Sequence, residues 1–164
     1  MVLPNTLKGL IKILPSELKD ILFQQWHAKQ NPKWHPEGNT LKHILYVLKR
    51  AFKNHGDNPN VILSALFHDL GKLATYKINP ETGQPSAHGH EGISAELVLK
   101  YKDWINGFEG ASVDTIYEVV KNHMKIKPST WNNMRTTKKD KVRNHPSYND
   151  LMSFGKLDKG GNEI

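Results

Sequence analysis

The segment PNVILSALFHDLGK, residues 59–72, constrains the fold more than any other part of the sequence. Between residues 61 and 67 every side chain except Ser64 is apolar, so a helix here has no polar face to turn towards water. Other parts of the chain must therefore surround it. We expect a short central helix from Asn60 to about Leu70, which Gly71 ends by adopting a left-handed backbone conformation.

Five other stretches carry apolar side chains at helical spacing and predict a bundle around this central helix. They are residues 15–26, 39–52, 90–104, 112–124 and 146–158. Two linking segments, residues 77–89 and most of 127–144, lack such spacing and are predicted to form loops. Because no stretch has a convincing strand pattern, the predicted fold class is all-α.

The composition is that of one folded domain, which we expect to span residues 1–164. A chain of 164 residues with 37% apolar residues is long enough to bury a core. Residues 1–14 contain neither a long apolar run nor a small-residue cleavage site, so we expect no signal peptide, no membrane span and a cytoplasmic location. The sequence has no cysteine, which excludes disulfides and leaves His, Asp and Glu as the metal ligands.

The net charge of +7 comes from one part of the sequence. Residues 121–145, here called the basic segment, contain eight Lys or Arg residues and one acid, Asp140. The other 15 basic and 15 acidic residues cancel. Such a segment is either a solvated loop or an electrostatic landing site for phosphate groups.

Three polar side chains beside apolar helix faces are candidate metal ligands. His43 lies within one predicted helix, and His68 and Asp69 end the central helix. A single inward histidine is more often a core residue with both ring nitrogens hydrogen-bonded. A carboxylate at the end of an apolar helix is costly, however, unless a cation neutralises it, and a divalent metal held by imidazole and carboxylate does so. Two packed helices can bring the three side chains together.

These residues carry a resemblance to a known family. His43, the pair His68 and Asp69, and the late Asp158 are similar to the H…HD…D signature of the HD-domain metal-dependent phosphohydrolases. Three longer blocks resemble the HD domain attached to bacterial CCA-adding tRNA nucleotidyltransferases. They are WHPEGNTLKHILYVL (34–48), ALFHDLGK (65–72) and AHGHEGISAELV (87–98). The resemblance covers about residues 24–161 and implies a single HD-type helical bundle.

The resemblance also implies the ligands of a first metal ion. His43, His68 and Asp69 match the family pattern directly, and Asp158 matches by its place near the end of the last predicted helix. Asp150 is the alternative to Asp158, but it lies in the first turn of that helix, where an acid is ordinary.

Members of the family with two metals add two histidines as ligands. His90 and His123 occupy the corresponding places here, with His88 as the alternative to His90. The implied cofactor is therefore one or two divalent metal ions, of Mn, Fe, Co, Ni, Zn or Mg.

Asp69 and Lys72 are the predicted catalytic residues. With two metals present, Asp69 is expected to bridge them while a metal-activated hydroxide attacks phosphorus in line. Lys72 is expected to contact a substrate phosphate, or else to serve only as a cation at the helix C-terminus. His35 and Glu37 are expected to border the pocket or to orient a ligand.

The basic segment is expected to lie close to the metals, because it joins His123 to the helix that carries Asp158. Trp131 within it is either a stacking surface for a base or a packing anchor for the loop. The predicted substrate-binding residues are Lys72, Lys125, Lys127, Arg135 and Lys138, with Lys139 beside them.

The expected function is hydrolysis of phosphomonoester or 2',3'-cyclic phosphodiester bonds, and the expected partner is a nucleotide or nucleic-acid phosphate. Two alternatives stay open. The first is a nucleoside triphosphate or monophosphate hydrolase, as in dNTPase and 5'-nucleotidase relatives, with a base pocket near Trp34 or Trp131. The second is an HD scaffold without turnover that holds RNA or DNA through the basic segment. The filled ligand positions argue against the second alternative.

Overall fold

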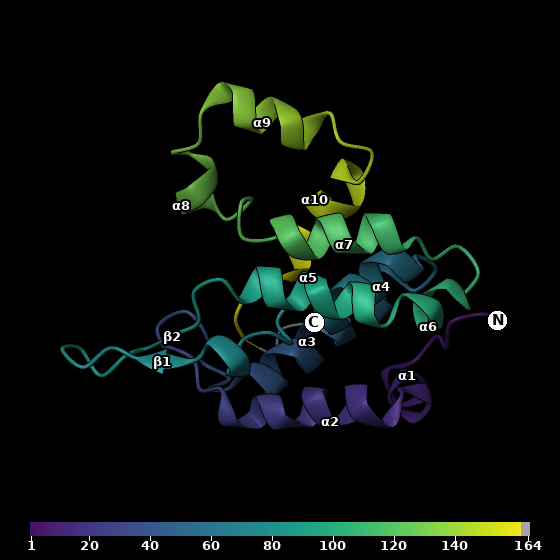
Figure 1. The fold of residues 1–164 in the computed structure, drawn as a ribbon, viewed down its shortest axis with the longest axis horizontal. Coiled ribbons are helices and arrows are strands. Elements are labelled where there is room, and N and C mark those ends of the chain that lie inside the picture. Colours follow the sequence, from purple (N-terminus) through teal and green to yellow (C-terminus); the bar gives the residue numbers. More distant parts are fainter. Residues whose placement is uncertain (162–164) are drawn as a thin grey trace.

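The computed structural model describes residues 1–161, which form ten α-helices, two 3₁₀ turns and one small hairpin (Figure 1). The helices are α1 (Leu7–Ile13), α2 (Ser16–Gln24), α3 (Thr40–His55), α4 (Pro59–Phe67), α5 (His90–Lys100), α6 (Lys102–Asn106), α7 (Val113–Asn122), α8 (Pro128–Trp131), α9 (Thr136–Arg143) and α10 (Tyr148–Leu157). The 3₁₀ turns are Gln25–His27 and Leu73–Thr75, and the strands are β1 (Lys77–Ile78) and β2 (Pro85–Ser86). The predicted all-α fold class is confirmed.

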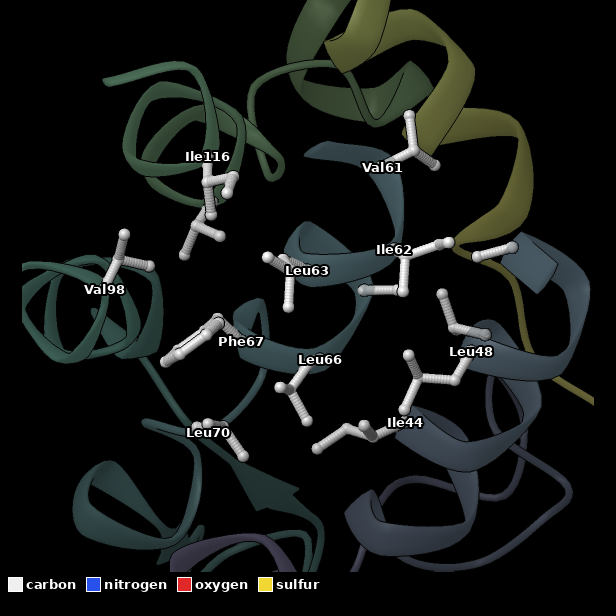
Figure 2. Close-up of a cluster of buried hydrophobic side chains, with 14 of the residues drawn as sticks. Ile44, Leu48, Val61, Ile62, Leu63, Leu66, Phe67, Leu70, Val98 and Ile116 are labelled. Atoms are coloured by element: carbon white, nitrogen blue, oxygen red, sulfur yellow. The ribbon is translucent and has the colours of Figure 1, made fainter. Parts of the chain in front are cut away.

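Helix α4 lies at the centre of the bundle, as its apolar sequence requires. It packs against α3, α5, α7 and α10, and all its side chains from Val61 onwards are buried. Figure 2 shows Leu66 and Phe67 of α4 between Ile44 of α3 and Val98 of α5. Burying such a side chain contributes about 1.5–3 kcal/mol to folding. Within residues 1–161, no helix combines the length and the apolar character needed to cross a membrane.

Two of the helices that pack against α4, α3 and α7, begin at a side-chain cap. At the start of α3 the side chain of Asn39 accepts a hydrogen bond from the backbone N–H of Lys42, 3.0 Å away. At the start of α7 the hydroxyl of Ser112 accepts one from the backbone N–H of Thr115. Each cap satisfies a backbone donor that lacks a partner within its helix, which fixes where the helix begins.

The end of α4 differs from the prediction. The α-helix ends at Phe67, and residues 68–72 continue as a series of turns. Gly71 is not among the glycines with positive φ, so the predicted left-handed conformation is wrong. Glycine is needed here for a different reason, because a Cβ would collide with the carbonyl oxygen of His90 on α5. The backbone N–H of Gly71 also donates to the hydroxyl of Ser94, 2.8 Å away.

The secondary structure of two segments differs from the prediction. Residues 77–89, predicted as a loop, contain the antiparallel pair β1 and β2, in which Lys77 lies opposite Ser86. Strands of two residues are too short to produce an alternating pattern in the sequence. Residues 90–104, predicted as one helix, are divided into α5 and α6 at Tyr101, where the backbone leaves the helical region.

The predicted loop through most of residues 127–144 is wrong, because this segment contains α8 and α9. Together the two helices stand as an arch over α7 and α10 (Figure 1). Helix α9 has no buried residue, so it lacks the apolar stripe by which helices are recognised in a sequence. Trp131 at the end of α8 links the two helices, because Lys139 and Arg143 of α9 lie over its ring.

Candidate metal centre

Five parts of the fold deliver polar side chains to one buried place. His43 comes from within α3, His90 from the first residue of α5, and the others from residues just after α4, α7 and α10. All of them are at most 8% exposed although they carry ionisable groups. The set is His43, His68, Asp69, His90, His123 and Asp158. Buried ionisable groups are stable only when they are paired or bind a cation.

The first group of ligand atoms surrounds one oxygen of Asp69. His68 Nε2 lies 3.2 Å and His43 Nε2 lies 3.4 Å from Asp69 Oδ2. The two histidine Nε2 atoms are 3.4 Å apart. Asp158 Oδ1 completes the group, 2.9 Å from His43 Nε2 and 3.5 Å from His68 Nε2.

The second group uses the other oxygen of Asp69. Oδ1 lies 3.0 Å from His90 Nε2 and 3.5 Å from His123 Nε2. The two Nε2 atoms of these histidines are 3.2 Å apart. One carboxylate, that of Asp69, therefore belongs to both groups.

These separations fit metal coordination. Two donor atoms that bind one ion at about 2.1 Å, with angles of about 90–110°, lie about 3.0–3.4 Å apart. The nitrogen–oxygen and nitrogen–nitrogen distances given above range from 2.9 to 3.5 Å. Nitrogen and carboxylate oxygen donors suit Mn, Fe, Co, Ni and Zn. The donor set can therefore hold one divalent ion in each group.

Each of the four histidines is oriented by a hydrogen bond on the far side of its ring. The Nδ1–H groups of His68, His90 and His123 donate to the backbone carbonyls of Ala65, Ala87 and Val120, and that of His43 donates to Glu37 Oε1. Because a carbonyl or carboxylate oxygen can only accept, Nδ1 carries the proton. Nε2 of each ring then points into the site and is the nitrogen that can bind a metal ion when it carries no proton.

Glu37 is held by two histidines near it in the sequence and by the backbone of Gly161, 124 residues later. Its Oε1 accepts from His43 Nδ1 at 3.1 Å and lies 3.0 Å from His35 Nδ1, and its Oε2 accepts from the backbone N–H of Gly161 at 2.6 Å. Burial raises the pKa of Glu37, but the hydrogen bonds from His43 and Gly161 outweigh burial and lower the pKa to about 2. The carboxylate is therefore ionised at neutral pH, as the expected orienting role requires.

Arg50 supports the candidate site through backbone contacts, and sequence reasoning missed it. It is buried on α3, and its guanidinium donates to the backbone carbonyls of Leu157, Lys159 and Gly161. These bonds hold the chain on either side of Asp158 and so position that carboxylate. The sequence contains a sign that Arg50 is buried, because an arginine two helical turns after His43 falls on the same face of the helix.

The charges inside the site make protons competitors of metal ions. Burial lowers the pKa of His68, but the carboxylates of Asp69 and Asp158 outweigh it and raise this pKa to about 9. Burial likewise raises the pKa of both carboxyl groups, and the positive His68 holds both well below their usual range. Burial lowers the pKa of His123. At neutral pH a metal ion must therefore displace a proton from His68.

Two lysines reach the carboxylates of the site. Lys127 Nζ lies 2.8 Å from Asp158 Oδ2 and donates to the backbone carbonyl of the same residue. Lys72 Nζ lies 3.3 Å from Asp69 Oδ2 and donates to Gln30 Oε1 at 3.2 Å. Of the five predicted substrate-binding residues, these are the two that the structure brings to the metal ligands.

A cavity of about 540 Å³ borders the site. His90, Lys72 and Met124 line it, and Trp34, which is 65% exposed, lies at its edge. Gln30 also lines the cavity, and sequence reasoning missed it. This side chain is 8% exposed, and its Nε2 is a buried donor without a partner.

The other predicted substrate-binding residues lie elsewhere. Lys125, Arg135 and Lys138 line a second cavity, of about 980 Å³, under the arch of α8 and α9. Trp131 lines neither cavity and packs between the two helices of the arch.

The two alternative ligands do not reach the ligand groups. His88 is exposed in the loop before α5, and the neighbouring His90 contacts Asp69 instead. Asp150 accepts a hydrogen bond from the side-chain amide of Asn58, which caps α4.

The orienting contact of Glu37 leads to a prediction. Replacing Glu37 with glutamine removes the negative charge behind His43, so that ring becomes a weaker ligand. We expect metal affinity to fall by about 10- to 100-fold, as is usual when such a partner is lost. Titration of the metal against a competing chelator at fixed pH measures the change. Glu96→Gln, at an exposed position on α5, is the matched control, and equal affinities of the two variants would contradict the role of Glu37.

Comparison with known proteins places this centre in a family. The HD domain family model matches residues 40–151, which include His43, His68, Asp69, His90 and His123. The chain belongs to the HD domain family, a superfamily of metal-dependent phosphohydrolases, and its His/Asp groups can hold metal.

Several curated relatives carry the name "Multifunctional CCA protein". The chain is 34% identical to the one from Burkholderia vietnamiensis over 104 residues, 56% of this chain and 24% of the relative. It is 45% identical to that from Thioalkalivibrio sulfidiphilus over 90 residues, 55% of this chain and 20% of the relative. It is 39% identical to that from Shewanella denitrificans over 86 residues, 50% of this chain and 20% of the relative. The chain therefore matches a quarter or less of the length of these relatives.

Proposed function

We propose that this protein is a metal-dependent phosphohydrolase that cleaves phosphomonoester or 2',3'-cyclic phosphodiester bonds in nucleotides or at nucleic-acid ends. The observation that carries the proposal is the position of Asp69, whose two carboxylate oxygens each belong to one group of ligand atoms. When bound, divalent ions would supply a hydroxide nucleophile near neutral pH and neutralise charge on the phosphoryl group.

The side chains around the ligands suit a phosphate substrate. Lys72 offers a positive charge at the border between the site and the 540 Å³ cavity. Gln30 fixes Lys72 with its Oε1, and its unpartnered Nε2 is a second donor. Because a buried donor without a partner costs about 1–3 kcal/mol, an acceptor oxygen of the substrate is its natural partner. Lys127 remains paired with Asp158 and orients that ligand.

A second candidate function, hydrolysis of free nucleoside mono- or triphosphates, is supported by Trp34. Its exposed ring borders the cavity, with Lys33 Nζ 4.9 Å from the ring centre. An exposed indole can stack on a nucleobase and contribute about 1–3 kcal/mol. This candidate uses the same ligands and the same nucleophile, and differs in the size of the substrate.

A substrate panel tests the proposal. The purified chain is loaded in turn with Mn, Co, Ni, Mg and Zn, and its bound metal is measured. Each form is then assayed with p-nitrophenyl phosphate, its bis ester, 2',3'-cyclic and linear mononucleotides, nucleoside triphosphates and short oligonucleotide phosphates. We expect turnover of monoesters or cyclic diesters with at least one ion. Bound metal without turnover of any substrate contradicts the proposal, and preference for free triphosphates favours the second candidate.

A further inference from the structure

The cavity under the arch is a separate feature of the protein. Residues of α7, α8, α9 and α10 line it, and its volume is about 980 Å³. Figure 1 shows α8 and α9 above α7 and α10. This volume is at the upper end of the range of about 300–1,000 Å³ for small-molecule sites. None of its lining residues is a ligand of the metal centre. The cavity therefore needs an explanation of its own.

The lining of this cavity is strongly positive. Its single acid, Glu118, is already engaged, because its Oε2 accepts from the side-chain amide of Asn122 at 3.0 Å. Five cationic side chains line the cavity: Lys121, Lys125, Arg135, Lys138 and Lys141. Among residues 1–161, none of the five lies within ion-pair distance of a carboxylate. Like charges gathered around a cavity repel one another, and an anionic ligand removes that repulsion.

The lining of the cavity also includes apolar side chains. Val142 and Leu151 contribute apolar surface from α9 and α10, and Met134 adds to it from the turn between α8 and α9. Cationic side chains combined with apolar ones suit a ligand that has several phosphates and flat, weakly polar groups between them. A nucleic-acid strand has this composition, and proteins bind single strands by tracking the backbone with positive charge.

The arch and the metal centre share a wall. Met124 lines the cavity of the metal centre, whereas the next residue, Lys125, lines the basic cavity. Lys127, two residues further on, is bonded to the metal ligand Asp158. The arch therefore begins at the metal centre. Trp131, at the end of α8, contacts Lys139 and Arg143 of α9.

We propose that the basic cavity binds the backbone phosphates of a single-stranded nucleic acid whose end reaches the metal centre. The placement of the strand end at the metal centre rests on the proposed function, because it makes a nucleic-acid end the substrate. Binding of the strand in the cavity does not depend on that function. A duplex is excluded as the favoured ligand because the cavity lies beneath two linked helices and has room for only a few nucleotides.

The test measures binding without turnover. Fluorescence anisotropy of a labelled short oligouridylate is recorded with the full chain in the presence of a chelator, over a series of salt concentrations. The variant Arg135→Gln/Lys138→Gln removes two cavity charges. We expect about tenfold weaker binding, and a salt slope smaller by about 1.4, since each phosphate contact to a single strand contributes about 0.7.

The control removes the same charge elsewhere. Lys8→Gln/Lys12→Gln lies on exposed positions of α1, away from the arch (Figure 1), and should bind as the unmodified protein does. The proposal is overturned if the two double variants lose equal affinity, if the unmodified protein does not bind oligouridylate, or if a duplex or ATP binds more tightly than the single strand.

A second measurement separates this inference from the proposed function. For an oligonucleotide with a terminal phosphate, the cavity variant should raise KM and leave kcat unchanged, whereas KM for p-nitrophenyl phosphate should not change. Equal effects on both substrates count against the cavity as a strand site. If no substrate is hydrolysed but the anisotropy result holds, the proposed function fails and strand binding in the cavity is retained.

Discussion

Hydrolysis by the Asp69→Asn variant is expected to be at least about a thousandfold slower than that of the unmodified protein. Each oxygen of Asp69 lies in a separate ligand group, so the amide weakens both groups at once. Stabilisation of charge by a metal ion contributes several kcal/mol to such a reaction, and each 1.36 kcal/mol corresponds to a factor of ten. The measurement is kcat/KM with the substrate and ion that give the highest rate in the panel.

The matched control for this variant is Asp20→Asn. Asp20 is an exposed residue of α2, on a helix that carries none of the ligands, so its neutralisation should leave both rate and metal content unchanged. Metal content measured on the same samples shows whether the lost activity follows lost ions. Undiminished hydrolysis by Asp69→Asn would refute the assignment of the metal centre.

The Gly71→Ala variant is expected to lose about 2–3 kcal/mol of unfolding free energy. The added Cβ would meet the carbonyl oxygen of His90, the side chain of Ile93 and the backbone nitrogen of Ser94. Two of these contacts are backbone atoms of α5, which cannot move without moving the helix, and overpacking of this kind costs about 1–3 kcal/mol or more. The shift also displaces His90, so the second ligand group should bind metal less tightly.

Gly92→Ala is the control, because it makes the same change in the first turn of α5, the helix that Gly71 approaches. A Cβ at Gly92 meets nothing within 4 Å, and alanine in a helix interior is favoured over glycine by about 0.8–1 kcal/mol. Denaturant unfolding of both variants, with slopes compared to confirm that the denatured states are equivalent, gives the difference. Equal stability of the two variants would disprove the close approach of α4 and α5 at Gly71.

The sequence predicted the central elements of this fold because their signals are local. The unbroken apolar run of α4 and the helical spacing of apolar residues in α3 and α7 are each visible within one short stretch of sequence. His43, His68 and Asp69 were candidate ligands by their places on apolar helices, the other three followed from the family resemblance, and the structure brings all six into one buried place. Whether they bind metal stays a prediction that the variants above address.

The features that the sequence did not predict depend on distant contacts. Arg50 donates to the backbone carbonyl of Leu157, 107 residues away, and Gly161 donates to Glu37, 124 residues away. No local pattern encodes such a pairing, since backbone carbonyls are the same in every residue type. Helix α9 was not predicted for a different reason, which is local. Its side chains are almost all solvated, so it has no apolar stripe, and Trp131 holds it through cationic side chains instead.

The position of Asp158 has a consequence for the order of folding and metal uptake. His43 and Asp158 are separated by 115 residues, and Asp158 is the last of the six ligands along the chain. Contacts between such distant residues form late in folding, because a long loop must close first. The helix that ends at Asp158 also places Leu151, Phe154 and Leu157 in the hydrophobic core, so the core and the first ligand group are completed together. We expect tight metal uptake to report the completed fold, because the last ligand is delivered only when α10 has docked.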